Sequence, residues 1–78
     1  MRECFVSFAS AADVQEFVAI ATRQGYPIHV ERDGMRTSAK SIMSVFSMGL
    51  HRPLRVVIGD AKADSSCFFS AVQPYLVA

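Results

Sequence analysis

The chain has 78 residues, 51% of them hydrophobic, and its 8 basic and 7 acidic residues leave a net charge of +1. This length is enough for one domain, and the mixed charges form no basic face that would favour nucleic acid. No apolar run is long enough to cross a membrane, and the first ten residues lack the apolar core of a secretory signal. We therefore expect a single cytoplasmic domain over residues 1–78, with neither nucleic acid nor membrane as a partner.

Few residues of the sequence combine into a chemical site. The two cysteines, Cys4 and Cys67, lie far apart in no metal-ligand spacing, and we expect both to be reduced and mostly buried. The sequence has no paired nucleophile and base and no glycine-rich phosphate loop. We therefore expect no enzyme activity, no metal and no cofactor.

The first half of the chain predicts a strand, a helix and two further strands. Residues 2–8 form the first strand, and Ser10 can cap a helix whose first turn contains Asp13. The helix ends at "RQGYP", where glycine and proline follow each other closely. "IHVER" and "MRTSA" are then two strands joined by Asp33-Gly34, which is a strong hairpin signal.

The second half predicts a helix, a strand and a last helix. The helix begins near Ser41, and Gly49 can end it in the left-handed conformation. "PLRVVIG" alternates apolar residues as a strand does. Asp64 can cap the last helix, which Pro74 should kink or end early.

The predicted order is β-α-β-β-α-β-α, and its first six elements match the ferredoxin-like arrangement. One sheet with the helices on a single face is the economical way to bury three amphipathic helices. The expected core consists of Val14, Phe17, Val18, Ile42, Val45, Val56, Ile58, Phe69 and Val72. An RNA-binding module of this order is disfavoured, because the strand "MRTSA" lacks aromatic stacking residues. A small-molecule-binding regulatory domain stays open as an alternative.

Two segments carry a resemblance to a known family. "SAKSIMSVFSMGL" and the upstream "VERDGMRT" resemble the second helix and the preceding hairpin of HPr, the histidine phosphocarrier of the bacterial sugar phosphotransferase system. The resemblance covers nearly the whole chain. It implies an α+β fold, an open-faced β-sandwich in which a four-stranded antiparallel sheet has three helices on one face.

The chain departs from this family where HPr carries its phosphoryl group. Counted back without gaps from Ser41, the family's histidine, arginine and proline fall on Ser10, Ala12 and Asp13. We therefore expect that the protein does not accept a phosphoryl group from Enzyme I, the donor of that system. The stretch "GLHRP" looks like the family's signature, but its His51 follows the second helix instead of starting the first. A rewired carrier that uses His51 is a further alternative.

Ser41 is the main candidate for function. The resemblance implies that this serine is a regulatory phosphorylation site, with a serine kinase or a transcriptional regulator as partner. Beside it, a basic residue and apolar side chains could form a docking surface, made of Lys40, Ile42, Met43 and Phe46. The competing interpretation is that Ser41 only caps the helix and that the apolar residues belong to the core.

Overall fold

The computed structural model describes residues 3–60 and 62–77. The elements are β1 (Glu3–Val6), α1 (Ala11–Thr22), β2 (Ile28–Arg32), β3 (Met35–Ser38), α2 (Ile42–Ser47), β4 (Leu54–Ile58) and α3 (Ser66–Ala71), and a 3₁₀ turn (Gln73–Tyr75) follows α3. Their order is the predicted β-α-β-β-α-β-α. The first strand is shorter than the expected 2–8, because β1 ends at Val6, and residue 2 lies outside the described residues.

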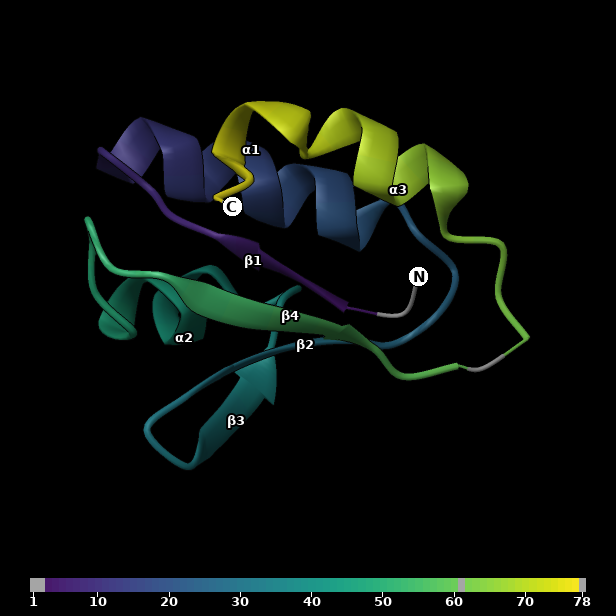
Figure 1. Ribbon diagram of the computed structural model, residues 1–78, viewed down its shortest axis with the longest axis horizontal. Coiled ribbons are helices and arrows are strands. Elements are labelled where there is room, and N and C mark those ends of the chain that lie inside the picture. The colour runs from purple at the N-terminus through teal and green to yellow at the C-terminus, as the bar shows by residue number, and fades with distance from the viewer. Residues whose placement is uncertain (1–2, 61, 78) are drawn as a thin grey trace.

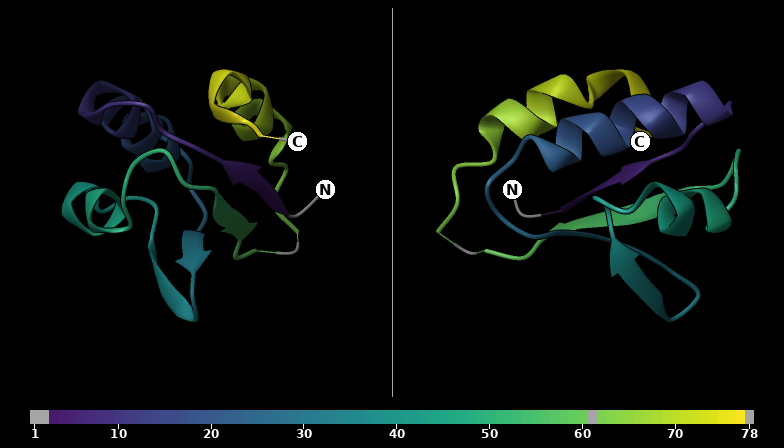
Figure 2. Two further views of the ribbon diagram at one scale, coloured as in Figure 1. Left: turned by 60° about the vertical axis from the view of Figure 1, so that its left-hand side comes forward. Right: turned by 180° about the vertical axis from the view of Figure 1, so that it is seen from behind.

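The four strands form one antiparallel sheet in the order β1-β4-β2-β3. All three helices lie on the same side of this sheet, with α1 and α3 side by side and α2 in contact with α1 (Figures 1 and 2). The predicted fold class is therefore confirmed. The other side of the sheet is left without a helix in the described part of the chain.

The hairpin between β2 and β3 forms where the sequence predicts it. Asp33 and Gly34 both have positive φ angles, 53° and 79°, and Arg32 pairs with Met35 across the turn. Two residues of positive φ fit a type I′ turn, whose twist matches that of the flanking strands. The hairpin fixes the register of half of the sheet.

The outer edge of β1 is covered by the C-terminal segment. The Ser7 amide donates to the Tyr75 carbonyl at 2.9 Å, and the Val77 amide donates to the Phe5 carbonyl at 3.0 Å. Val6 and Leu76 form an isolated antiparallel bridge between these bonds. One edge of the sheet is thus occupied by the protein itself.

The core lies between the sheet and the helices, and most of the predicted core residues are in it. Phe8, Phe17 and Phe68 pack in series at centroid distances of 5.1 and 6.1 Å. Two of the residues expected in the core are not fully buried. Phe69 is only half-buried, and Ile42, expected in the core, is 41% exposed. Ile42 is the first residue of α2. Part of its side chain lines a hollow next to α1, and the rest faces solvent.

Two local predictions also need correction. The residue at the N-cap of α3 is Ser65, and Asp64 precedes it and accepts from the Ser66 amide and hydroxyl at 3.1 and 2.7 Å. These bonds lower the pKa of the Asp64 carboxyl. Cys4 is buried as expected, but Cys67 is exposed, and both are free thiols. The expectation for Pro74 is confirmed, because α3 ends at Ala71 and the chain passes into the 3₁₀ turn.

Candidate functional site

The start of α1 is capped by the side chains of Ser10 and Asp13. Ser10 is the N-cap, with an extended backbone, and its Oγ accepts from the Asp13 amide at 3.3 Å. In return, Asp13 Oδ2 accepts from the Ala9 amide at 3.0 Å. This reciprocal pattern resembles a capping box, which satisfies amides that the helix itself leaves unpaired. A carboxylate already lies where an incoming phosphoryl group would need those amides.

The surroundings of this helix start are acidic as well. The hydroxyl of Tyr75 has a raised pKa, because the ring is partly buried and because the carboxylates of Glu16 and Asp13 lie nearby. Its ring packs edge-on against Phe8 at 5.8 Å. An anion would meet negative charge here, which opposes the attraction of the helix dipole.

His51 lies closer to this helix start than its sequence position suggests. Gly49, with φ +96°, follows the end of α2, and His51 comes two residues later with φ +61° and an exposed side chain. The His51 amide donates to the Phe8 carbonyl at 2.7 Å, so the α2–β4 loop rests against the β1–α1 loop. Both loops lie at the same end of the molecule (Figure 1). The sequence indicates correctly that His51 follows a helix, but it does not reveal this neighbour.

Ser41 is placed at the start of α2, as predicted. Its backbone is extended and its carbonyl accepts from the Val45 amide at 3.0 Å, so it is the N-cap residue. Its side chain, however, makes no capping hydrogen bond, and the Oγ donates to Ser44 Oγ at 3.1 Å. Ser41 is half-buried. The hydroxyl is therefore not committed to stabilising the helix start.

An apolar surface lies next to Ser41. Met43 is 75% exposed and Phe46 is 46% exposed, and together with Ile42 they form what we call the α2 patch. The patch borders a hollow of about 180 Å³ between α1 and α2, which is lined by Ala11, Val14, Gln15, Ile42, Met43 and Phe46. Of the two interpretations of these residues, their exposure agrees with a docking surface and not with a place wholly in the core.

Lys40 does not join this patch through its charge. Its Nζ donates to the Gln24 carbonyl at 2.8 Å, just beyond the end of α1. The Lys40 backbone amide donates to Ser38 Oγ at 3.1 Å. Lys40 therefore ties the β3–α2 connection to the end of α1, and its ammonium group is turned to that contact.

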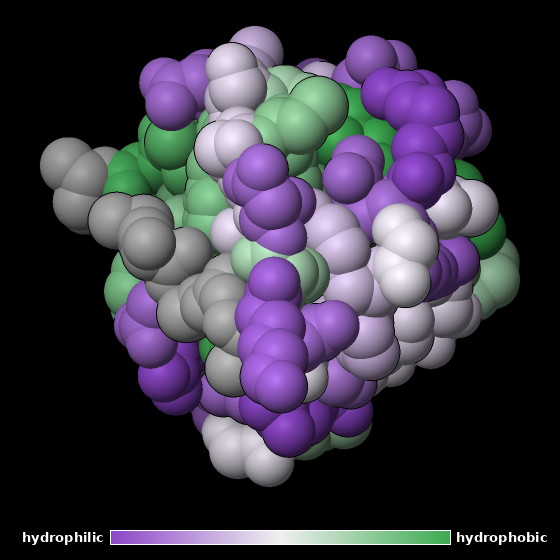
Figure 3. Space-filling model, turned by 90° about the vertical axis from the view of Figure 1, so that its right-hand side faces the viewer, coloured by the Kyte–Doolittle hydropathy of each residue, from purple (hydrophilic) through white to green (hydrophobic). Residues whose placement is uncertain are grey.

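The rest of the described surface offers weaker candidates for a functional site. A hollow of about 500 Å³ lies between β1 and α3 beside Cys4, and one of about 430 Å³ lies by the hairpin near Phe5. Both are open to solvent. The face of the molecule in Figure 3 is mainly hydrophilic, with apolar colour in separate patches. Within residues 3–60 and 62–77, no three metal-binding side chains cluster, and no helix is long and apolar enough to span a membrane.

Comparison with known proteins gives one informative likeness. The phosphocarrier protein HPr from Bacillus anthracis str. Ames has a similar structure, with a TM-score of 0.73 over 96% of this chain and 95% of that one. The two sequences are 24% identical over this range. No family model matches the chain, and no curated protein matches it. The likeness shows that the fold is the HPr fold.

Proposed function

We propose that this HPr-fold protein is a cytoplasmic regulatory module that binds another protein through Ser41 and the α2 patch, and that it does not carry phosphoryl groups. The observation that carries the proposal is the Ser41 hydroxyl, which is not used as a helix cap and directly precedes Ile42 and Met43, two residues that line an apolar hollow. The partner we favour is a serine kinase, a transcriptional regulator, or both in turn, as in carbon regulation linked to the phosphotransferase system.

The position of Ser41 suits modification. A phosphate there would add about −1.5 to −2 charges, and it would replace the side-chain bond to Ser44. Modification of Ser10, by contrast, would break the cap of α1. Phosphorylation at Ser41 would therefore change the charge of the α2 patch and leave the fold intact.

The α2 patch suits docking. Exposed large apolar side chains that cluster around a hollow are typical of protein-binding surfaces, where a few anchors supply most of the energy. Burying one such side chain contributes about 1.5–3 kcal/mol. Met43 is the best anchor, because it is the most exposed of the three and lies at the rim of the hollow.

The start of α1 supports the second half of the proposal. Ser10 has no side-chain nitrogen to phosphorylate, and Asp13 holds the Ala9 amide with its own carboxylate. Ala12 offers no cation to a phosphate. We accordingly assign the protein neither phosphoryl carriage nor enzyme activity.

The test compares two exposed methionines on different surfaces. Met43 is 75% exposed in the α2 patch, and Met35 is 68% exposed on β3. Candidate partners, namely the serine kinase and the regulators of the host's phosphotransferase system, are titrated with wild type, Met43→Asp and Met35→Asp. We expect Met43→Asp to weaken binding at least tenfold and Met35→Asp to leave it unchanged.

A second arm addresses Ser41 itself. The kinase and ATP are added to wild type, Ser41→Ala and Ser44→Ala, and phosphate is located by mass spectrometry. We expect modification of wild type and of Ser44→Ala, and none of Ser41→Ala. If Ser41 stays unmodified and Met43→Asp binds every tested partner as wild type does, the proposal is wrong and Ser41 is only a helix cap residue.

A further inference from the structure

The side of the sheet that faces away from the helices is an organised surface. In β1, β2 and β4, alternate residues are buried under the helices, among them Val6, Val30 and Val56. The alternate residues point to the other side, which we call the open face: Glu3, Phe5, His29, Glu31, Arg36, Ser38, Arg55 and Val57. No element of the described chain covers this face.

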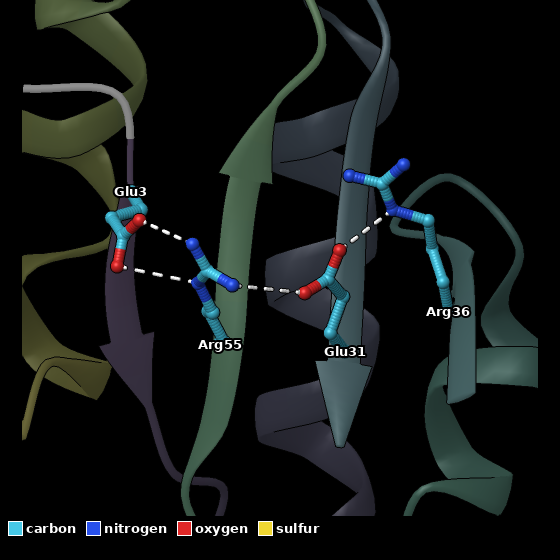
Figure 4. A network of polar contacts seen from close by, with 4 residues as sticks. All are labelled: Glu3, Glu31, Arg36 and Arg55. Carbon is cyan, nitrogen blue, oxygen red and sulfur yellow. Dashed lines mark hydrogen bonds and ion pairs between the residues drawn. The ribbon is translucent and has the colours of Figure 1, made fainter. Parts of the chain in front are cut away.

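Four charged side chains cross the open face from edge to edge. Arg55 donates to both Glu3 oxygens at 3.2 and 2.6 Å, and its Nη1 lies 3.3 Å from Glu31 Oε1. Glu31 Oε2 is 2.7 Å from Arg36 Nε. The four residues come from β1, β4, β2 and β3, so the row follows the strand order of the sheet (Figure 4).

The charges of this row alternate, and the row is neutral as a whole. From β1 to β3 the signs run negative, positive, negative, positive. The hydrogen bonds from Arg55 lower the pKa of Glu3, and the same contacts raise the pKa of Arg55. These contacts favour the charged forms of both groups and keep the two side chains paired on the open face.

We propose that the open face binds the open face of a second copy of the protein, around a two-fold axis that runs parallel to the strands between β4 and β2. Such an axis reverses the strand order of the second copy, so β4 of each copy faces β2 of the other. The two central charges of the row, Arg55 and Glu31, then each face the opposite charge of the second copy. A C2 interface requires this kind of self-complementary surface.

The register of the strands gives the individual contacts. Arg55 and Glu31 are direct cross-strand neighbours, so Arg55 of each copy lies opposite Glu31 of the other. Phe5 pairs with Arg55, and Arg36 pairs with Glu31, so the exposed ring of Phe5 lies opposite the Arg36 guanidinium of the second copy. A guanidinium over an aromatic face is an attractive contact.

The next row fits in the same way. Glu3, Val57, His29 and Ser38 are in register across the four strands. The two-fold axis places Val57 opposite His29 and places Glu3 opposite Ser38 of the second copy. The first pair brings methyl groups against a half-buried imidazole ring, and the second brings a carboxylate to a hydroxyl.

A second copy fits the face better than a strongly charged partner does. An acidic protein would meet Glu3 and Glu31, and a basic protein would meet Arg36 and Arg55, so each would face as many like charges as opposite ones. Like-charge contacts across an interface are strongly unfavourable. A surface with the reversed alternation avoids them, and the chain itself supplies one.

The size of the face sets the strength of the association. The four strands are four or five residues long, so the sheet offers a face of roughly 19 × 17 Å, about 300 Å² per protomer, which is below the roughly 800 Å² of a standard interface. We therefore expect a weak, reversible dimer that forms at protein concentrations approaching millimolar and that weakens with salt, because exposed charges are screened. The helices stay free, so this inference does not depend on the proposed function.

The test uses charge reversal in two variants and in their mixture. Arg55→Glu and Glu31→Arg each place like charges opposite each other at the centre of the dimer, so each variant alone should dissociate at least tenfold more readily than wild type. In an equimolar mixture, Glu at 55 of one chain faces Arg at 31 of the other, and association should return. Sedimentation velocity over a concentration series measures all three cases.

Two further variants are matched controls for charge. Arg23→Glu and Glu16→Arg make the same changes on the exposed surface of α1 and its C-cap, away from the open face. They should associate as wild type does. A wild type that is monomeric at millimolar protein concentration overturns the proposal, and so does a mixture of folded Arg55→Glu and Glu31→Arg that stays monomeric.

A last variant covers the case in which charge reversal prevents folding. Phe5 is 46% exposed, so Phe5→Lys leaves the core untouched and places a cation opposite Arg36 of the second copy. Association should weaken at least tenfold. Unchanged association of folded Phe5→Lys overturns the proposed arrangement.

Discussion

Gly49 joins α2 to the loop that carries His51, and alanine at this position should destabilise the protein by two separable effects. The φ angle of Gly49 is +96°, in the region that residues with a Cβ rarely adopt. A Cβ at this position would lie 3.3 Å from Arg32 Nη2 and 3.5 Å from Arg32 Nη1. Backbone strain and a steric contact therefore act together.

Two other glycines separate these effects. Gly34 has φ +79°, but no atom lies within 4 Å of the position that a Cβ would take, so alanine there brings strain without contact. Gly25 has neither a positive φ nor a close neighbour, so alanine there only lowers the entropy of the unfolded chain. The three substitutions share this entropy effect, and their differences isolate the other two.

The expected magnitudes follow from these differences. A left-handed L-residue costs about 1–2 kcal/mol, so Gly34→Ala should destabilise by about 1 kcal/mol relative to Gly25→Ala. Gly49→Ala should add about 1 kcal/mol more, because the Arg32 side chain is only 19% exposed and has little room to shift. In an Arg32→Ala background, the cost of Gly49→Ala should fall to that of Gly34→Ala.

Urea unfolding followed by far-ultraviolet circular dichroism measures these free energies of unfolding. If Gly49→Ala destabilises no more than Gly25→Ala, the turn after α2 does not have the left-handed geometry, and backbone strain is refuted as a cause. If Gly49→Ala costs the same as Gly34→Ala with Arg32 present, the contact with Arg32 is unimportant.

Three other predictions concern the cysteines and phosphoryl transfer. In the folded protein at pH 8, iodoacetamide should modify the exposed Cys67 and leave Cys4 intact, as read by mass spectrometry. Burial raises the pKa of Cys4 from 9.0 to about 11, so the folded state keeps a proton that the unfolded chain loses. Between pH 9 and 11 this thiol should lower the free energy of unfolding by about 2 kcal/mol, and Cys4→Ala should remove this part of the slope and leave the part due to Tyr75, whose pKa is also raised. Incubated with Enzyme I and labelled phosphoenolpyruvate, the protein should take up no acid-labile phosphate; label on His51 would contradict this and favour a rewired carrier, and Ser10→His alone should not restore transfer.

The parts of the fold that depend on local chemistry could be predicted from the sequence. The turn at Asp33-Gly34 and the end of α2 at Gly49 need positive φ angles, and both positions carry residues that tolerate them. Ser10 with Asp13 three residues later signals a helix start, and the structure has it. These features need only neighbours within four residues.

The errors concern residues whose environment is set by distant parts of the chain. Periodicity assigned Ile42 to an apolar helix face, but it could not show that α1 covers only one side of that residue. Cys67 was expected inside because free cysteines usually are, yet its side of α3 faces solvent. For Ser41, the sequence predicted the position at the start of α2, and its role stays a proposal.

The charged row on the open face could not be found from the sequence. Glu3 and Arg55 are 52 residues apart and look like ordinary surface charges. Only the register of β1 against β4, and of β4 against β2, brings their side chains together with Glu31. A residue pattern shows which face a strand residue takes, but it does not show its neighbour on the next strand.

The pairing of β1 also sets an order for folding during synthesis. The β2–β3 hairpin has both strands within residues 28–38, so it can form as soon as that segment leaves the ribosome. Strand β1 is made earlier, but its two neighbours are β4 and the segment at 75–77. It must therefore wait, unpaired, until β4 has been made, and its outer edge waits longer, for residues 75–77. Contacts of such sequence separation slow folding, and an unpaired apolar strand can associate with other chains. Strand β1 is thus the first of the four strands to emerge, although its partners, β4 and residues 75–77, are made after the other strands.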